Sequence, residues 1–129
     1  MYLQTSAWGR AKKQTYNGNQ YDSKFEASYA QELDLRKKAG EITGYDTQVN
    51  LELKVNGYVV CDYRIDFIVY YPESAGGIIE YVETKGYATP TWRLKWKLFE
   101  ALYTDLPNTR LLVVKQKNNW KMRKLKKAK

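Results

Sequence analysis

Residues 48 to 86 decide the fold and read QVNLELKVNGYVVCDYRIDFIVYYPESAGGIIEYVETKG. Asn56-Gly57 is the strongest short-range signal for a two-residue hairpin turn. The strand that follows should run from about residue 58 to residue 71, and a third strand should cover residues 78 to 85, after a turn rich in Gly. Apolar residues alternate before the Asn-Gly turn and should share one face of the first strand: Val49, Leu51, Leu53 and Val55.

Helical patterns flank these strands. Ser23 and Glu26 form a capping-box pattern, and a helix should begin there and end near Gly40, with an apolar stripe of Phe25, Tyr29 and Leu33. A second helix is predicted over residues 91 to 103, with Pro90 near its start. Its expected apolar stripe is Leu94, Leu98 and Leu102.

A last, buried strand is predicted over residues 109 to 114, which read TRLLVV. The element order is therefore α-β-β-β-α-β, with a strand-helix-strand crossover at the end. That order predicts an α/β fold in which helices flank a mixed central sheet.

Three charged residues lie where two of the predicted strands should meet. Glu83 and Lys85 are two apart and point to the same face, and pairing of the strands would bring Asp66 to Glu83. Two carboxylates beside a lysine suit a hard divalent cation such as Mg²⁺, with Mn²⁺ as a substitute, and the carbonyl of Thr84 is a further candidate ligand. Because the lysine can orient or activate a water for attack on a phosphodiester, the pattern predicts metal-dependent DNA cleavage. The alternative is an exposed ion pair, since this pattern also arises by chance.

The composition limits the kinds of catalytic and metal-binding sites that this chain can form. The 129 residues include one cysteine and no histidine. An internal disulfide, Ser-His-Asp catalysis and most zinc sites are thereby excluded, and a metal would be held by oxygen ligands. Since no run reaches the roughly 18 apolar residues of a membrane span and the start has no apolar signal-peptide core, we expect a cytoplasmic protein without a membrane partner.

The net charge of +8 is placed unevenly. Residues 115 to 129 hold eight of the 22 Lys and Arg and no acid, which leaves 14 basic and 14 acidic residues in the rest of the chain. We therefore predict a basic tail over residues 116 to 129 that contacts DNA, with an anionic membrane or an acidic protein as the alternative. Its candidate DNA contacts are Lys121, Arg123 and Lys124. Residues 1 to 20 are expected to form a loose basic arm, and residues 21 to 115 the folded domain.

The element order, with Ile65-Asp66 on the second strand and Glu83-Thr84-Lys85 on the third, resembles the PD-(D/E)xK nuclease superfamily. Ile here replaces the superfamily's Pro. The surrounding sequence is also similar to small phage-encoded members of this superfamily, which resemble archaeal-type Holliday junction resolvases. That similarity covers roughly residues 20 to 115 and includes YDSKFEA at 21–27, ETKGY at 83–87 and TPTWRLKWKLF at 89–99.

The resemblance implies a restriction-endonuclease-like core and a homodimeric, Mg²⁺-dependent enzyme that resolves four-way DNA junctions in the cytoplasm of an infected host cell. It also implies that Glu26, otherwise only a helix cap, joins the metal site. Ser23 and Lys24 then become candidate phosphate contacts at a helix N-terminus.

Several alternatives stay open. Asp62 is the rival metal ligand because it falls on the face of Asp66, where it could instead pair with Arg64. Glu80 is off that register and is expected to be solvated. Arg93 and Lys97 are candidate DNA contacts on the second helix, with Lys97 placed nearest the site and Lys95 on another side. The rival functions are a less selective nuclease on duplex, flap or single-stranded DNA, and a non-catalytic DNA-binding module.

Overall fold

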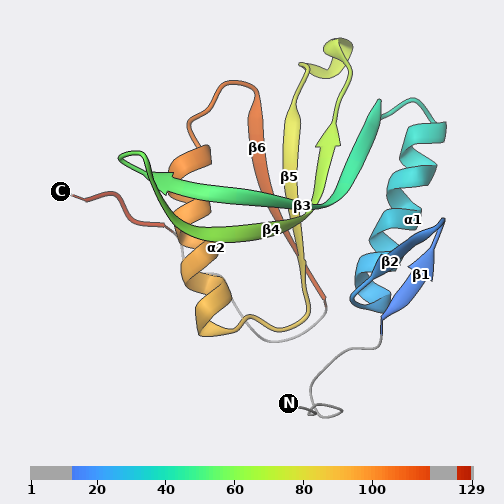
Figure 1. Cartoon of the computed structure of the whole chain (residues 1–129). Coiled ribbons are helices and arrows are strands. Elements are labelled where there is room, and N and C mark those ends of the chain that lie inside the picture. Colours follow the sequence, from blue (N-terminus) through green and yellow to red (C-terminus); the bar gives the residue numbers. More distant parts are fainter. Residues whose placement is uncertain (1–12, 117–124, 129) are drawn as a thin grey trace.

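A computed structural model describes residues 13–116 and 125–128, and it contains a four-stranded mixed sheet with a helix on each side and a small additional hairpin (Figure 1). The elements are β1 (Gln14–Tyr16), β2 (Asn19–Tyr21), α1 (Lys24–Lys38), β3 (Gly44–Val55), β4 (Tyr58–Tyr70), β5 (Ile79–Lys85), α2 (Pro90–Tyr103) and β6 (Thr109–Lys115), with a 3₁₀ turn at Glu73–Ala75. The predicted DNA contacts Lys121, Arg123 and Lys124 lie outside the described residues.

The strand order in the sheet is β3-β4-β5-β6. The first two pairs are antiparallel and the β5–β6 pair is parallel. A parallel neighbour requires a crossover, and α2 supplies it. The predicted α/β architecture with a mixed, helix-flanked sheet is confirmed at this level.

The hairpin between β3 and β4 turns at Asn56 and Gly57, whose φ angles are 53° and 82°. Positive φ at both central residues is what a type I′ turn requires, so the predicted turn is confirmed. The pairing shifts between Leu53 and Lys54, and Val55 is 40% exposed. The shift skips Val60 on β4 and leaves the alternation of β3 intact, so Val55 is exposed because it lies at the last pair before the turn and not because it changes face.

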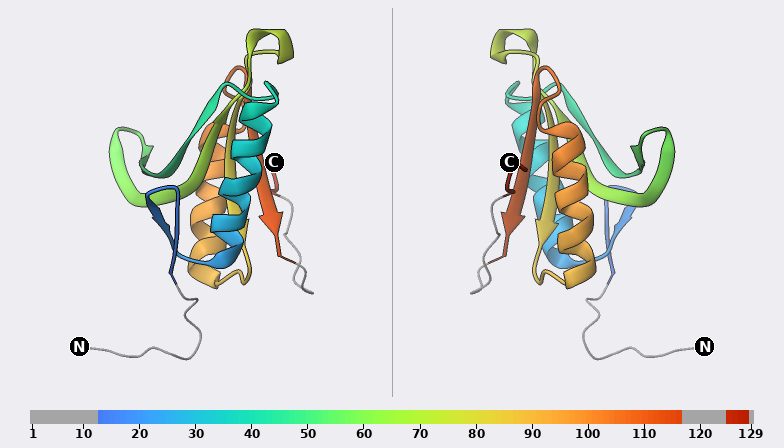
Figure 2. Two further views of the ribbon diagram at one scale, coloured as in Figure 1. Left: turned by 90° about the vertical axis from the view of Figure 1, so that its right-hand side faces the viewer. Right: turned by 90° about the vertical axis from the view of Figure 1, so that its left-hand side faces the viewer.

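The two helices cover opposite faces of the sheet, as the two side views in Figure 2 show. On the α1 side, Phe67, Val69 and Val82 pack with buried residues of the helix. On the α2 side, Tyr63 and Ile65 belong to a second cluster. Tyr63, Ile65, Phe67 and Val69 have the same parity on β4, so the strand exchanges faces between Ile65 and Phe67, and Asp66 lies at that exchange.

The first helix begins and ends as predicted. The Ser23 hydroxyl accepts a hydrogen bond from the Glu26 N–H at 3.1 Å, and Gly40 follows the helix with φ of 78°. Tyr29 and Leu33 are buried in its core cluster.

The predicted apolar stripe of α2 is wrong at Leu94, whereas Leu98 and Leu102 are partly buried against the core cluster on the α2 side. The buried residues of α2 are Trp92, Trp96 and Phe99, whereas Leu94 is 71% exposed. Positions 92, 96 and 99 also have helical spacing, and burying three large aromatic rings removes more apolar area from water than burying leucines.

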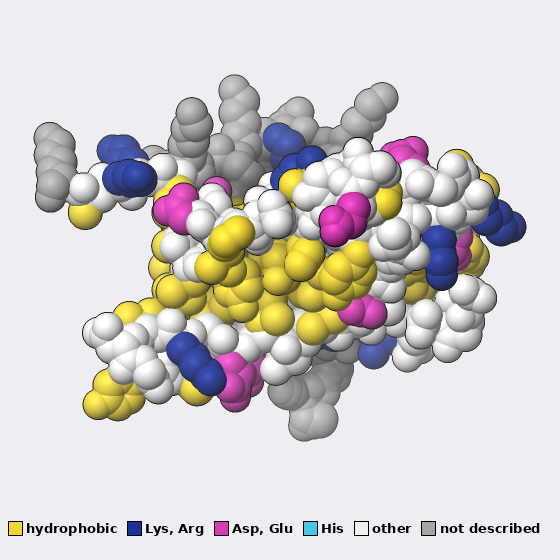
Figure 3. All heavy atoms as spheres, turned by 90° about the horizontal axis from the view of Figure 1, so that it is seen from above, with side chains coloured by type: hydrophobic (Ala, Val, Ile, Leu, Met, Phe, Trp, Pro, Cys, Tyr) yellow, Lys and Arg dark blue, Asp and Glu magenta, His cyan; other side chains and the backbone are white. Residues whose placement is uncertain are grey.

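The α2 side is only partly covered. Tyr70, Ile79, Tyr81 and Tyr103 are partly buried against its cluster. A broad area of hydrophobic side chains is open on the face seen from above (Figure 3).

Two further predictions need correction. Residues 14 to 20 are not part of a loose arm, since β1 pairs with β2, whose last residue Tyr21 is fully buried in the α1 cluster. Strand β6 is half-exposed rather than buried, because it is paired on one edge only and Leu112 is 37% exposed. Among the described residues, no helix is both long and apolar enough to cross a membrane.

Candidate active site

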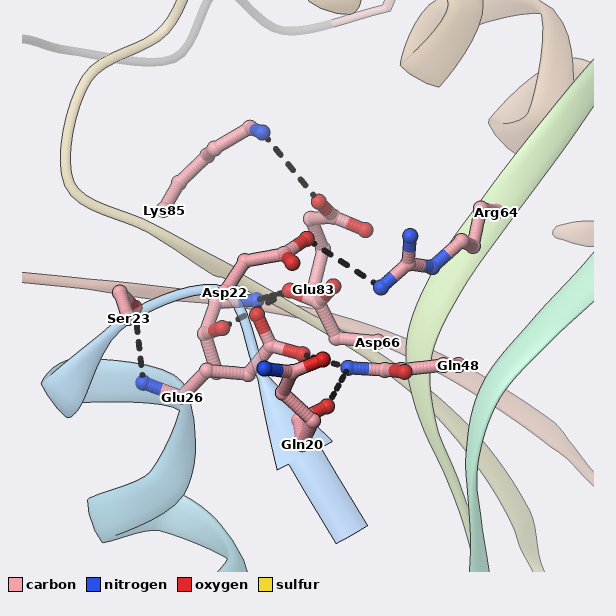
Figure 4. Close-up of polar contacts among 10 residues, drawn as sticks. Gln20, Asp22, Ser23, Glu26, Gln48, Arg64, Asp66, Glu83 and Lys85 are labelled. Atoms are coloured by element: carbon pink, nitrogen blue, oxygen red, sulfur yellow. Dashed lines mark hydrogen bonds and ion pairs between the residues drawn. The ribbon is translucent and has the colours of Figure 1, made fainter. Parts of the chain in front are cut away.

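Asp66 and Glu83 lie side by side on the neighbouring strands β4 and β5 (Figure 4). The register pairs Phe67 with Val82, so the next positions along the two strands are Asp66 and Glu83. Both carboxylates are buried, with exposed fractions of 8% and 3%. The predicted meeting of these two residues is confirmed.

Thr84 holds the Asp66 carboxylate. Its backbone N–H and its hydroxyl both donate to Asp66 Oδ2, each at 2.8 Å. Burial raises the pKa of Asp66, and the two bonds from Thr84 oppose that rise. Thr84 was predicted to act through its carbonyl, and the structure adds this second role for its N–H and side chain.

Glu83 is held from two sides. Its Oε1 accepts a hydrogen bond from the Tyr63 hydroxyl at 2.8 Å, and its Oε2 lies 3.5 Å from Lys85 Nζ. Burial and then the charge of Asp66 raise the pKa of Glu83 to about 8, against the opposing effect of Lys85. Burial also raises the pKa of Tyr63, which keeps its hydroxyl protonated as the donor.

Glu26 extends this acidic cluster from the first turn of α1. The residue is 4% exposed, and its carboxylate accepts a hydrogen bond from Gln48 Nε2 at 3.1 Å. Burial and the charge of Asp66 raise the pKa of Glu26 to about 7. Glu26 is therefore more than a helix cap, because only its backbone N–H serves the cap and its side chain is electrostatically coupled to the site.

Gln48 is a site residue that the sequence did not reveal. It lies on β3 between the paired residues Thr47 and Val49, which places it across from Asp66. Its φ of 55° is left-handed, a strained conformation for a residue other than glycine. This backbone turns the side chain toward both Glu26 and the carbonyl of Gln20, to which Nε2 donates at 2.9 Å (Figure 4).

The acidic cluster opens into a cleft of about 810 Å³. Its lining includes four residues of the predicted metal and catalytic site, which are Glu26, Asp66, Thr84 and Lys85. It also includes Lys13, Ser23 and Thr89, which could contact phosphates. The predicted contact Lys24 is exposed and does not line this cleft.

A smaller hollow of about 320 Å³ adjoins the same residues on the α2 side. It is lined by Tyr63, Arg64, Trp92 and Lys95 together with Asp66, Glu83 and Lys85. Lys95, whose Nζ also donates to the Asp62 carbonyl at 3.0 Å, thus occupies the place predicted for Lys97. Neither Arg93 nor Lys97 lines either hollow, because they lie on other sides of α2.

The rival carboxylates lie elsewhere. Asp62 is exposed and lines neither hollow, and Arg64 pairs with Asp22 at 3.2 Å rather than with Asp62. Glu80 is not solvated as predicted. It is 4% exposed because Arg110 covers it, at 2.8 Å from its Oε2.

The carboxylate oxygens of this site are the kind of ligand that a hard divalent cation prefers. Within the described residues, no three His, Cys, Asp or Glu side chains form a ready-made metal centre. Glu26, Asp66 and Glu83 nevertheless supply only oxygen. Burial raises the pKa of all three, and repulsion from the Asp66 charge further raises the pKa of Glu26 and Glu83. A bound cation such as Mg²⁺ would offset that repulsion, so these are the residues that would hold it.

Comparisons with known proteins place the chain in a family. A family model described as "Protein of unknown function (DUF1064)" matches residues 7–127, nearly the whole chain, and the protein belongs to that family. No curated protein matches the sequence significantly, and no solved structure does so either.

Proposed function

We propose that this member of the DUF1064 family is a Mg²⁺-dependent DNA endonuclease that cleaves four-way junctions. The observation that carries the proposal is the buried pair Asp66 and Glu83 with Lys85 beside it. Asp66 and Lys85 line the larger cleft, and all three residues line the smaller hollow that adjoins it. Buried carboxylates are costly unless they are paired or bind a cation, and groups with strongly shifted pKa values cluster at functional sites. The proposal includes a restriction-endonuclease-like version of the α/β fold.

Each residue has a defined task in this proposal. Asp66 and Glu83, with Glu26 and the Thr84 carbonyl, would hold Mg²⁺, which when bound stabilises negative charge at the scissile phosphate. Lys85 lines both hollows and carries donor protons, so it orients the attacking water and a phosphate oxygen.

The wall of the cleft serves the substrate. Ser23 and Lys13 lie at its α1 side, where a hydroxyl and a cation favour a phosphate, and Lys95 offers a cation on the α2 side. The basic tail adds a nonspecific attraction to DNA.

A homodimer is part of the proposal because resolving a four-way junction requires two cuts in symmetry-related strands. A chain of this size carries one such site, and a two-fold dimer presents two sites in related orientations. The partly buried aromatic residues on the α2 side are an apolar surface of the kind that dimers bury. Sedimentation at working concentration measures the oligomeric state, and a monomer would contradict this part of the proposal.

The cleavage test uses labelled four-way junctions and linear duplexes, with Mg²⁺ and with EDTA. We expect Mg²⁺-dependent paired nicks near the branch point and little cleavage of the duplex. Equal cleavage of both substrates would favour the less selective nuclease, and binding without cleavage would favour the DNA-binding module.

Matched variants make the assignment specific. Asp66→Asn and Lys85→Ala should abolish cleavage and leave DNA binding in place. Asp62→Asn is the control, because it removes a carboxylate from the same strand, four residues away, that faces neither hollow. Cleavage lost in Asp62→Asn but kept in Asp66→Asn would overturn the assigned site.

A further inference from the structure

Four residues form a closed ring of contacts around the Glu-Thr-Lys segment: Tyr63, Glu83, Lys85 and Trp92. Trp92 Nε1 donates to the Tyr63 hydroxyl at 3.1 Å, and that hydroxyl donates to Glu83 Oε1 at 2.8 Å. Lys85 Nζ lies 3.5 Å from Glu83 Oε2 and 5.1 Å from the centroid of the Trp92 ring, which closes the ring of contacts.

We propose that Tyr63 and Trp92 are positioning residues that fix the orientation of Glu83 and Lys85 for metal binding and catalysis. This inference rests on the proposed function and goes beyond it, because neither aromatic residue belongs to the carboxylate-lysine pattern.

The hydrogen bond from Trp92 fixes the direction of the Tyr63 hydroxyl proton. An indole N–H can only donate, so Trp92 occupies a lone pair of the Tyr63 oxygen. The single hydroxyl proton of Tyr63 is then directed to Glu83 Oε1. One carboxylate oxygen is therefore anchored inside the protein, and the other, Oε2, is turned to the side of Lys85.

Lys85 is restrained by the same tryptophan. Its side chain is 26% exposed, so it would be free to sample several rotamers without a partner. The face of Trp92 attracts the ammonium group through a cation–π contact. Trp92 thus restrains both charged residues. Its π face holds Lys85 directly, and its N–H holds Glu83 through the hydroxyl of Tyr63.

The two aromatic residues are themselves fixed in a core. Tyr63 and Trp92 are 4% and 7% exposed, and both belong to the aromatic cluster that α2 packs against the sheet. Trp92 stacks on Trp96, with ring centroids 5.9 Å apart. A restraint that is itself fixed in a core can hold a ligand in place, and loss of such outer partners typically costs about 10- to 100-fold in metal affinity or activity.

The experiment titrates Mg²⁺ into the full-length protein without DNA by calorimetry and then measures cleavage rates. Tyr63→Phe removes both hydrogen bonds of this contact network, and Trp92→Phe removes the one between Trp92 and Tyr63; both variants keep an aromatic side chain. We expect each to weaken Mg²⁺ binding by about 10-fold or more and to lower kcat by a similar factor. Junction binding in EDTA should change by less than about twofold, because no positive charge is removed.

Two other variants separate positioning from packing. Trp92→Leu also removes the π face that holds Lys85, so its kcat should fall below that of Trp92→Phe. Trp96→Phe is the control, since it trims a neighbouring buried tryptophan that is outside the ring, and it should bind Mg²⁺ as the wild type does. Melting curves confirm that each variant is folded.

The outcomes are distinguishable. If the wild type binds Mg²⁺ and cleaves junctions but Tyr63→Phe and Trp92→Phe match it, the positioning inference is overturned and the proposed function stands. If Trp96→Phe loses as much affinity as Trp92→Phe, packing explains the effect and the inference is again overturned. If the wild type neither binds Mg²⁺ nor cleaves DNA, the proposed function fails and the inference fails with it.

Discussion

The buried carboxylates should make the protein less stable as the pH rises, and Glu83→Gln should remove a large part of that dependence. The pKa of Glu83 is raised from an ordinary 4.5 to about 8 in the folded protein. A group with a raised folded pKa stabilises the fold fully below its unfolded pKa, and that stabilisation is lost as pH rises through the folded value. Glu26, with a pKa raised to about 7, acts with the same sign over a narrower window.

The size of the effect follows from the shift. Between about pH 4.5 and pH 7.5 the unfolded chain releases the Glu83 proton and the folded protein keeps it. At about 1.4 kcal/mol for each pH unit, the free energy of unfolding should therefore fall by about 4 kcal/mol over this range. A domain of 129 residues loses about 4 °C in Tm per kcal/mol, so Tm should fall by about 15 °C over this range.

The chain is well suited to this measurement because it has no histidine. Apart from the α-amino group, ordinary side chains do not titrate between about pH 5 and pH 8, so the slope there reports the buried carboxylates.

The assay is a series of thermal melts in EDTA from about pH 5 to about pH 8. Glu83→Gln should give a much flatter curve, and Glu52→Gln, which changes an exposed glutamate on the hairpin, should follow the wild type. Mg²⁺ should raise Tm more at pH 8 than at pH 5, because ionised carboxylates bind the cation. Equal slopes for Glu83→Gln and wild type would refute the reasoning.

Three other predictions address the fold and the tail. Gln48→Gly should be more stable than Gln48→Ala by about 1 kcal/mol in urea denaturation. Both variants lose the same side-chain hydrogen bonds, and only glycine adopts the left-handed φ without strain. Equal stabilities would show that the backbone at Gln48 is not strained. Phe99→Ala should cost about 3 to 5 kcal/mol and Leu94→Ala less than about 0.5, measured in the same way, and the reverse order would restore the leucine stripe. Ending the chain at Asn119 removes six basic residues and should flatten the plot of log K against log salt by up to about 0.9 per lost phosphate contact, whereas an unchanged slope would show that the tail does not touch DNA.

Local signals predicted the parts of the fold that depend on a few neighbouring residues. The Asn56-Gly57 turn and the Ser23 cap are set by backbone chemistry within four residues, and both are as predicted. The proximity of Asp66 and Glu83 was also predictable, because the two strands follow one another in the chain and pair as antiparallel neighbours.

The hydrophobic pattern of the sequence could not show which face of α2 is buried. Leucines and aromatic residues of α2 both recur at helical spacing, and only the shape of the sheet decides that Trp92, Trp96 and Phe99 are buried. The same rotation of the helix brings Lys95 rather than Lys97 to the site. Tyr63 and Trp92 gave no functional signal in the sequence, because a buried aromatic residue on a strand or helix is ordinarily part of a core.

The position of Asp66 follows from an irregularity that the alternation does not encode. A regular strand would carry residues 63 to 69 of one parity into a single core, whereas here Ile65 packs under α2 and Phe67 under α1. Asp66 lies between the two cores, across from Gln48 with its left-handed backbone, and so faces a polar cleft rather than an apolar layer. The left-handed backbone at Gln48 and the placement of Asp66 thus occur at the same point, where β4 exchanges faces. A substitution that regularised β3 at Gln48 would move Asp66 toward one of the cores, where an ionised carboxylate has no place.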